Sequence, residues 1–589
     1  MEKRSYQKGV IFLCNENEEA LDIEVEPGIK DVEIHFNLLM PESKKSFPDV
    51  QELTICEDVT DIKIPNTLFP NVVLVKSESR SFYDNENCLI KNDNCFRKLL
   101  NVFCGPDTEF NLTNIHRIAD YAFSDSNITK FKDIRKTLYS CERNAFTNSV
   151  FDKRPFVGGV KMAGDILFAV DENAETITLH DEEKSLYMCA DGVHLSKVKH
   201  MIIHDCLSIS GYKIEEMPQC ITLDTVNNID AATLEHTMHM VRPKNGSYIH
   251  EFHLSDNVSS YKEVNGMIYT KDMSLLVGCS ADKEEAIIPE GVKKIASYAF
   301  TNTHVKYIKL PDSLETIQDY AFCKCSELTD IDFGGGLSCI SRYAFLRCSH
   351  LEYIKLPEQM RVIGSFAFSY SGLKSIELND GLRIIHNSAF DETQLSKLAL
   401  PDSLEILEPL GKSQCITYIS AEKYIARMAS SIFSYGKLTG ITSYDDAVVE
   451  FICAGRTLFI PKYIRNKGYS DMCRRINVFF SNNEDDENIS LYSYAATVAG
   501  RENTALKEYL HFHGDAQKEY LKKHATQIIS RLMNEKDQEN VVQFLKLDLI
   551  SNKKLKELLK LSNDLELSIV SSYVLEKLNG KTSSGNFNI

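Results

Sequence analysis

Pairs of cysteines and histidines are the residues of this 589-residue chain best suited to chemistry. Cys325 and Cys348 lie 23 residues apart, in the similar segments KCSEL and RCSHL, so they could bind a metal or form a redox pair. Neither has the second ligand pair that a zinc finger requires, and both lie inside apolar patterns. We therefore predict that they are small buried side chains of the core.

Two pairs of histidines offer nitrogen ligands but lack the rest of a metal site. His236 and His239 are separated by two residues, and His511 and His513 by one. No set of cysteines or carboxylates beside either pair completes a site. In a helix, moreover, residues i and i+2 do not face each other. We expect structural roles for both pairs, and we expect neither a metal nor a cofactor in this chain.

Catalytic and phosphate-binding motifs are missing from the sequence. The glycine triplet 334–336 invites a phosphate loop, but it lacks both the Lys-Ser/Thr of a P-loop and G-x-G-x-x-G spacing. It lies where neighbouring segments have turn residues, so we predict a turn. The sequence also has no G-x-S-x-G elbow, kinase signature or H-E-x-x-H motif. These observations predict that the protein is not an enzyme.

The net charge argues against proteins that bind nucleic acid or anionic membrane mainly by electrostatic attraction. The chain has 66 Lys plus Arg and 84 Asp plus Glu, a net charge of −18. Lys553, Lys554 and Lys556 form a local basic cluster, which we interpret as the solvated face of an amphipathic helix. Nucleic acid is therefore not expected among the partners.

The apolar runs and the cysteines predict a cytoplasmic protein without a membrane span. No apolar run approaches the roughly 18 to 20 residues that cross a bilayer. The first apolar stretch, residues 10–14, is shorter than the core of a signal peptide. The 17 cysteines are odd in number and scattered, so we expect free thiols rather than a disulfide framework.

A repeat of 22 or 23 residues organises the central part of the chain. Successive units run IPEGVKKIASYAFTNTHVKYIKLP, DSLETIQDYAFCKCSELTDIDF and GGGLSCISRYAFLRCSHLEYIKLP, and two more follow. Each unit ends in V-x-x-I-x-L, whose last two apolar residues have the period of a strand. The V-x-x-I-x-x-x-A-F half predicts a short helical or irregular return. We expect buried rings, stacked along the repeat axis, at Phe300, Phe322, Phe345, Phe368 and Phe390.

One unit cannot bury its apolar edge alone, so the units must stack into a solenoid with a parallel sheet along one side. The pattern L-P-x-S-L-x-x-I-x-x-x-A-F-x-x-C-x-x-L-x-x-I resembles the BspA-type leucine-rich repeat, specifically over residues 286–408. Degenerate copies precede it, including Phe123 and Phe146 after Ala. The family also has a longer insertion, similar here to residues 261–289, in which Asn265-Gly266 predicts a hairpin turn. Comparable insertions are expected within 82–103 and 158–179.

The predicted fold class is α+β: a leucine-rich-repeat solenoid with a parallel β-sheet face, followed by a small all-α domain. Helix-forming periodicity after an acidic break distinguishes the two parts. The helical part resembles ankyrin-type helix pairs without that family's usual turn motif. The expected segments are a solenoid at 1–410 (irregular rungs 1–285, regular rungs 286–408), a cap at 411–480 with a helical stretch at 421–435, a linker at 481–488, helices at 489–580 and a disordered tail at 581–589.

Outward side chains of the predicted strands form the candidate binding site. In V-x-x-I-x-L, the residues on either side of Ile point away from the core and line up in two columns on neighbouring strands. Alternating charges along a column could simply avoid like-charge pairs. With tyrosines as anchors, the same columns could instead bind a protein. The candidate residues are Tyr307, Lys309, Asp330, Asp332, Tyr353, Lys355 and Glu377.

These patterns are compatible with three functions. The first is a non-enzymatic scaffold or recognition subunit, in which the solenoid binds a protein partner and the helical domain offers a second docking site. The alternative, implied by the family resemblance, is a bacterial cell-surface adhesin; the lack of an evident signal peptide or wall anchor disfavours it. The third is an enzyme whose unrecognised activity resides among His511, His513 and His524. We expect the first.

Overall fold

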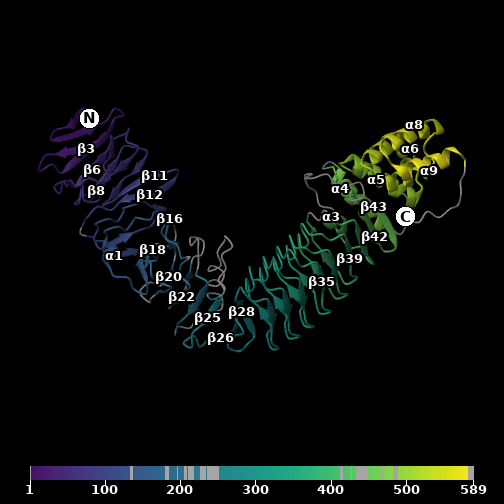
Figure 1. The fold of residues 1–589 in the computed structure, drawn as a ribbon, viewed down its shortest axis with the longest axis horizontal. Helices are drawn as coiled ribbons and strands as arrows, with labels where there is room; N and C mark the ends of the chain where they lie inside the picture. Colours follow the sequence, from purple (N-terminus) through teal and green to yellow (C-terminus); the bar gives the residue numbers. More distant parts are fainter. Residues whose placement is uncertain are drawn as a thin grey trace. The chain divides into compact units, whose positions relative to one another are not determined.

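In the computed structural model, the chain forms two compact units. The first comprises residues 1–284 and 295–305, and the second comprises 285–294 and 306–589. Within each unit, parallel strands pair with strands of the next turn along the chain (Figure 1). The structure describes all residues except 1, 106, 133–136, 180–184, 187, 196, 205–207, 210–217, 226–233, 235–250, 412–414, 426, 433–446, 466–467, 482–488 and 581–589.

Antiparallel strands begin the first unit, and parallel rungs continue from them. The strands of this part are β1 (Glu2–Gln7), β2 (Val10–Cys14), β3 (Glu19–Val25), β4 (Asp31–Ile34), β5 (Asn37–Leu39), β6 (Glu52–Ile55), β7 (Ile62–Lys63), β8 (Leu74–Ser77), β9 (Phe82–Tyr83) and β10 (Asn85–Glu86). After the antiparallel β1-β2-β3 ribbon, β3-β5-β7 and β4-β6-β8 form two parallel ladders. Val10, Phe12 and Cys14 are buried in alternation, so this sheet packs one face on a core.

Hairpins interrupt the rungs of the first unit where the sequence predicts insertions. Their strands are β11 (Leu89–Asp93) with β12 (Phe96–Asn101), β17 (Val160–Ala163) with β18 (Ile166–Val170), and β26 (Tyr261–Val264) with β27 (Met267–Thr270), all antiparallel. Between β26 and β27, Asn265 and Gly266 have φ values of 53° and 71°. Positive φ at both central residues is what a two-residue type I′ turn requires. The predicted turn is confirmed.

The degenerate rungs predicted upstream are present in the first unit. Its remaining elements are β13 (Glu109–Asn111), β14 (Arg117–Ile118), β15 (Lys130–Lys132), β16 (Ser140–Cys141), α1 (Val150–Lys153), β19 (Thr176–Leu179), β20 (Ser185–Leu186), β21 (Met188–Cys189), β22 (His200–Ile203), β23 (Ser208–Ile209), β24 (Cys220–Leu223), β25 (Glu251–Leu254) and β28 (Leu275–Cys279). Parallel pairing joins β12-β14-β16 and β19-β22-β24-β25. The buried rings of Phe123 and Phe146 stack with centroids 5.3 Å apart.

Regular rungs, each with two short strands, form most of the second unit. The longer strand of each rung is β29 (Glu285–Ile287), β31 (Tyr307–Lys309), β33 (Asp330–Asp332), β35 (Tyr353–Lys355), β37 (Ser375–Glu377) or β39 (Lys397–Leu400). The shorter strand is β30 (Lys294–Ile295), β32 (Thr316–Ile317), β34 (Cys339–Ile340), β36 (Val362–Ile363), β38 (Ile384–Ile385) or β40 (Ile406–Leu407). From β32 to β40 the shorter strands form their own parallel ladder. The predicted helical or irregular return is therefore partly a strand, whose second residue is buried in the core.

A stack of buried phenylalanine rings runs through the core of the second unit. The rings of Phe322, Phe345, Phe368 and Phe390 are fully buried, and successive centroids lie 5.0, 5.2 and 5.9 Å apart. Their planes are within 10° of parallel. Phe300, in the first unit, is also fully buried. The prediction of buried rings is confirmed for all five positions, and the prediction of stacking for the four of the second unit.

A second aromatic ladder lies at the corner where each rung turns. The rings of Tyr320, Tyr343 and Phe366 stack with centroids 4.6 and 5.0 Å apart. All three residues have a positive φ, between 56° and 58°, which costs a side chain with Cβ roughly 1–2 kcal/mol. This conformation lets the N–H of Tyr320 donate to the next rung, to the carbonyl of Arg342 at 3.0 Å, and Tyr343 does the same to Ser365. Bonds between rungs offset the backbone strain.

The glycine triplet is the turn that the sequence predicts. Gly334 has a φ of 63°, and a Cβ on Gly336 would lie 2.0 Å from the carbonyl oxygen of Asp312 in the preceding rung. Only glycine fits so close to another backbone. The triplet therefore serves the stacking of rungs.

Parallel pairing continues past residue 410 and ends in an antiparallel strand. β39 pairs with β41 (Tyr418–Ala421), β41 with β42 (Val448–Cys453), and β42 then forms a hairpin with β43 (Arg456–Pro461). Within 421–435, Ala421 ends a strand and α3 (Met428–Ile432) is the described helix, shorter than expected. α4 (Tyr469–Ser481) follows. The sheet of β39, β41, β42 and β43 therefore ends in an antiparallel hairpin rather than in a further parallel rung.

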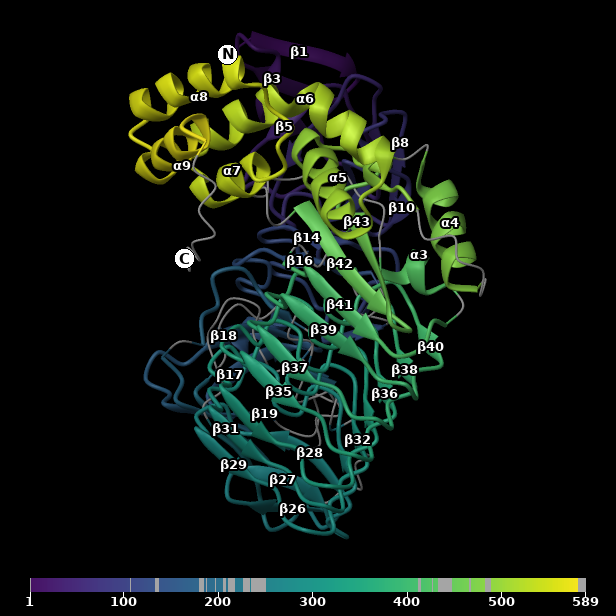
Figure 2. The ribbon, with the colours of Figure 1, turned by 90° about the vertical axis from the view of Figure 1, so that its right-hand side faces the viewer.

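An all-α domain follows, as predicted. Its elements are η4 (Tyr492–Tyr494), α5 (Val498–Phe512), α6 (Asp515–Asn534), α7 (Gln538–Leu545), α8 (Asn552–Asp564) and α9 (Ser568–Leu578). α5 packs on β42 and β43, and α6 to α9 share a core that includes Leu521, Phe544, Leu555 and Val570 (Figure 2). The predicted linker, beyond Ser481, and the predicted tail lie outside the described residues. The likeness to ankyrin-type pairs stays a prediction. Among the described helices, none is long and apolar enough to cross a membrane.

A buried carboxylate ties α5 to the segment that precedes it. Glu508 accepts hydrogen bonds from the backbone N–H of Leu491 at 2.6 Å and from Nε2 of Gln517 at 3.1 Å. Burial raises the pKa of Glu508 to about 7, because these hydrogen bonds only partly replace the water that an ionised carboxylate loses.

We predict that replacing Phe368 by Ala lowers the free energy of unfolding by about 3–5 kcal/mol, because it opens a cavity in the ring stack. The loss should fall on adjacent rungs, since coupling in a solenoid is nearest-neighbour. Hydrogen exchange of β34 to β38 and chemical denaturation measure both effects. Tyr370→Ala, two residues away and 52% exposed, is the matched control. Equal losses from the two variants would contradict the stack.

We predict that the helical domain loses stability as the pH rises from about 4.5 to about 7. The folded protein keeps the Glu508 proton up to about pH 7, whereas the unfolded chain releases it near 4.5, so unfolding releases a proton in this window. The free energy of unfolding should fall by up to about 3 kcal/mol across it. Glu508→Gln should flatten this profile in denaturation series, whereas Glu519→Gln, at an exposed position of α6, should not.

We predict that all 17 cysteines are free thiols, of which few react in the native state. The cysteines that the structure describes are free, and burial raises the pKa of Cys88 to about 12 and of Cys323 to about 11. At pH 8 the thiolate of Cys323 is then about one part in a thousand. Alkylation followed by mass spectrometry should label exposed Cys95 and Cys415 first, and all 17 after denaturation without reductant. A shortfall restored by reductant would reveal a disulfide.

Candidate protein-binding face

The predicted binding residues lie on the outward side of four successive strands of the second unit. β31, β33, β35 and β37 each have three residues, of which the middle one is buried or half-buried while its two neighbours lie on the opposite, outward side. Tyr307 pairs with Asp330 and Lys309 with Asp332, whereas Tyr353 pairs with Ser375 and Lys355 with Glu377. Figure 2 shows β35, β37 and β39 as neighbouring arrows. We call these seven candidate residues the outward face.

Tyr353, Lys355 and Glu377 form a connected group at one end of the outward face. The hydroxyl of Tyr353 donates a hydrogen bond to Oε1 of Glu377 at 2.7 Å, and Nζ of Lys355 lies 3.4 Å from the other carboxylate oxygen. The hydrogen bond from Tyr353 and the nearby Lys355 lower the pKa of Glu377, while the same hydrogen bond raises the pKa of Tyr353. Because all three are exposed, this group contributes to order at the surface more than to stability.

Lys309 and Asp332, at the other end, are adjacent in register but not joined. Asp332 instead accepts a hydrogen bond from the backbone N–H of Gly334 at 3.2 Å. In the described part of the chain, no ion pair links Lys309 to Asp332. Lys309 and Asp332 thus lie on the paired strands β31 and β33, and Lys355 and Glu377 on the separate pair β35 and β37, where an ion pair forms.

The two predicted tyrosine anchors differ in exposure. Tyr353 is 48% exposed and its hydroxyl is held by Glu377, whereas Tyr307 is half-buried. A ring that is exposed and already ordered is the better anchor for a partner, because little side-chain entropy is lost on contact. The geometry therefore favours Tyr353 as the stronger anchor of the two.

The outward columns extend to residues that the sequence analysis did not select. Ile287 on β29 pairs with Lys309 and is 62% exposed. At the other end, Nζ of Lys397 lies 6.0 Å from the ring centre of Tyr418. Ile287 and Lys397 follow the same period-two rule as the chosen residues. The predicted column of Tyr307 already runs to Lys397, and extending the neighbouring column by one rung identifies Ile287.

The other groups considered from the sequence do not converge on a site. Cys325 and Cys348 are fully buried, and the thiol of Cys348 donates to the carbonyl of Phe322 at 3.1 Å, as expected of core side chains. His511 lies in α5 with its ring against Phe459. His513 ends that helix with a φ of 54°.

A second pair of histidines and a cluster of lysines were also considered as binding groups. His236 and His239 lie outside the described residues. Lys553, Lys554 and Lys556 are exposed on α8, where Lys554 pairs with Glu557 at 2.7 Å, and Leu555 faces the helical core. This is the solvated helix face that the sequence predicts.

Comparison with known proteins identifies the repeat. Residues 92–205, 293–417 and 338–449 match the family described as BspA type leucine rich repeat region, in six copies. No curated protein matches the chain.

Among solved structures, similarity is reported for several bacterial proteins. The pneumococcal vaccine antigen PcpA is 15% identical, with a TM-score of 0.26, over 77% of this chain and 93% of its own. A leucine rich cell surface protein from Faecalibacterium prausnitzii is 14% identical, with a TM-score of 0.25, over 72% and 95%. A leucine-rich repeat protein from Bacteroides capillosus is 24% identical, with a TM-score of 0.19, over 20% and 98%. The stacked Ala-Phe rungs and the family match agree, and this chain carries BspA-type leucine-rich repeats over residues 92–205 and 293–449.

Proposed function

We propose that this chain is a non-enzymatic scaffold or recognition subunit that binds a protein partner through the outward face. The observation that carries the proposal is Tyr353, whose ring is 48% exposed while its hydroxyl is fixed by Glu377. Stacked repeats present such side chains on a stiff, extended surface, which suits partner binding. Aromatic residues of this kind dominate the binding energy of many protein interfaces.

Charges of both signs on the outward face favour a protein partner over nucleic acid. Lys309 and Lys355 lie among Asp330, Asp332 and Glu377, so no single-sign field attracts a polyanion. The association should therefore depend only mildly on salt.

The helical domain is proposed as a second docking site, and the cytoplasm as the location. Ile569 and Leu575 on α9 are 44% and 46% exposed, which supports an apolar contact there. Free thiols support a reducing compartment. Recovery of the protein on the surface of intact cells would instead favour the adhesin alternative.

We predict that Tyr353→Ala weakens binding of the partner by at least about thirtyfold, or 2 kcal/mol, because it removes an ordered anchor. The full chain is used to capture partners from its native host, and the captured protein is titrated calorimetrically at two salt concentrations. Tyr307→Ala should have a smaller effect, since that ring is half-buried.

Tyr370→Ala is the matched control, because Tyr370 is similarly exposed but lies outside the outward face. Unchanged affinity in a folded Tyr353→Ala/Tyr307→Ala variant would assign the face to solubility and contradict the proposal. A steep fall of affinity with salt would indicate a phosphate-bearing partner and would contradict it as well.

A further inference from the structure

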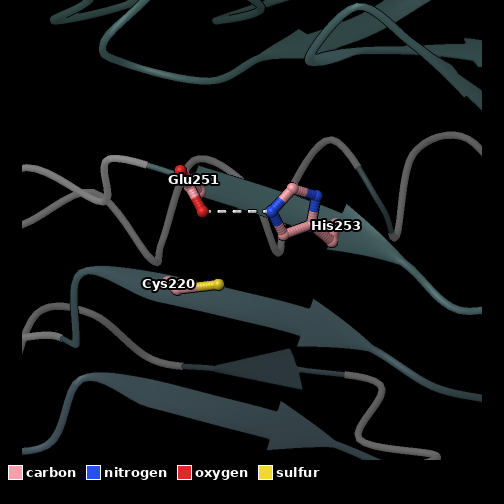
Figure 3. Close-up of side chains that lie close together, drawn as sticks. All are labelled: Cys220, Glu251 and His253. Carbon is pink, nitrogen blue, oxygen red and sulfur yellow. Dashed lines mark hydrogen bonds and ion pairs between the residues drawn. The ribbon is translucent and has the colours of Figure 1, made fainter.

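Three side chains with metal-binding atoms meet on a sheet of the first unit. Cys220 lies on β24, and Glu251 and His253 lie on the neighbouring strand β25 (Figure 3). Their ligand atoms, one from each side chain, all lie within 4.8 Å of one another. Among the described residues, no other group of three or more such side chains has its ligand atoms this close together.

Strand register explains why these residues come together. β24 and β25 are parallel, and Cys220 pairs directly with Glu251, while His253 is two residues further along the same strand. Residues two apart on a strand share a face, so Glu251 and His253 both stand beside Cys220. Phe252, between Glu251 and His253, is buried in the core. The side chains of Glu251 and His253 therefore lie on the opposite side of the sheet from the core, as does that of Cys220.

Glu263 orients the imidazole of His253. Oε1 of Glu263 lies 3.0 Å from Nδ1 of His253, and its other oxygen accepts a hydrogen bond from the backbone N–H of Leu254 at 3.2 Å. A carboxylate on one ring nitrogen is the usual outer-shell partner of a metal-binding histidine, because it holds the second nitrogen toward the ion. Here that second nitrogen, Nε2, lies 3.2 Å from Oε2 of Glu251.

The distances suit a tetrahedral ion of borderline softness. Zinc binds sulfur at about 2.3 Å and nitrogen or carboxylate oxygen at about 2.0–2.2 Å, which places ligand atoms about 3.3–3.6 Å apart. Nε2 of His253 and Oε2 of Glu251, 3.2 Å apart, are already near this spacing, and the Cys220 sulfur lies within 4.8 Å of a ligand atom of each. A thiolate, an imidazole and a carboxylate favour Zn²⁺ over Mg²⁺ or Ca²⁺.

We propose that Cys220, Glu251 and His253 bind a zinc-class divalent cation, with Glu263 as the positioning residue of His253. Glu251 is exposed and the other two ligands are half-buried, so an ion reaches the site from solvent. Three protein ligands leave the fourth tetrahedral position to water or to a ligand atom of a bound partner. The cation joins two neighbouring strands through outward side chains.

A similar trio elsewhere in the first unit provides a matched control. Glu33 and His35 are also two residues apart, and the Cys56 sulfur lies 3.9 Å from Nε2 of His35. That trio does not bring all three ligand atoms within 4.8 Å of one another. Cys56 is half-buried like Cys220. The variants Cys220→Ser and Cys56→Ser therefore change equally exposed thiols, of which only the first belongs to the proposed site.

The test uses the full chain, stripped with a chelator and titrated with Zn²⁺ alone in competition with a chromophoric chelator. We expect one equivalent of high affinity, weakened at least about 100-fold by Cys220→Ser and unchanged by Cys56→Ser. Glu263→Gln should weaken it about 10–100-fold, the usual cost of losing an outer-shell partner. With Co²⁺ as probe, a sulfur-to-metal absorption band should appear and be lost in Cys220→Ser.

Circular dichroism and a denaturation midpoint confirm that the variants remain folded, which is expected because the ligands point outward. Failure of the stripped protein to bind Zn²⁺ in the micromolar range would overturn the proposal. The ring of His253 would then serve only to bridge the carboxylates of Glu251 and Glu263. Binding that survives Cys220→Ser unchanged, or that depends on Cys56, would overturn it equally.

Discussion

The backbone hydrogen bond from each corner residue to the next rung is the interaction on which the regular repeats depend. Tyr320, Tyr343 and Phe366 adopt a positive φ that side chains disfavour, and each N–H then points along the repeat axis to a carbonyl of the following rung. The next aromatic residue repeats the bond, with Phe345 donating to Ala367 at 2.7 Å. These bonds fix the rise between rungs, and that rise sets the stacking of the phenylalanines and the register of the outward strands.

The regular spacing of apolar residues makes most of this fold predictable from the sequence. The features that depend on local backbone geometry are not predictable in this way. The Ala-Phe pairs recur every 22 or 23 residues, which predicts the stack of buried rings. The alternation of side chains along a strand predicts that residues such as Tyr353 point outward. The V-x-x-I segment of each repeat does not distinguish a helix from a strand. A spacing of three residues fits a helical turn as well as a turn followed by a two-residue strand. Opposite charges at neighbouring positions of one column also do not guarantee an ion pair: the carboxylate of Asp332 accepts from the backbone N–H of Gly334 in its own turn, and Lys309 forms no ion pair with it.

The cysteine, glutamate and histidine cluster could not be found by local spacing. Cys220 lies 31 residues before Glu251 in the sequence, and the spacing alone does not predict that the two pair on neighbouring strands. A search along the sequence instead meets His236 and His239, which are close in the chain. The available signal is Glu251-x-His253, since two ligands on alternate residues of a strand share one face. In stacked rungs, the missing ligand comes from the neighbouring strand.

The side chains that stabilise the fold differ from those proposed to bind a partner. A buried ring such as Phe368 contributes several kcal/mol, whereas an exposed ion pair contributes about 0–1. Outward residues can therefore change with little effect on folding. Ordering a free surface side chain on binding costs about 0.5–1.5 kcal/mol. The bond from Tyr353 to Glu377 has already restrained that ring, while Lys309 would still have to be ordered. In the proposed interface the favoured centre is therefore the pair β35 and β37, because Tyr353 is already ordered there before a partner binds.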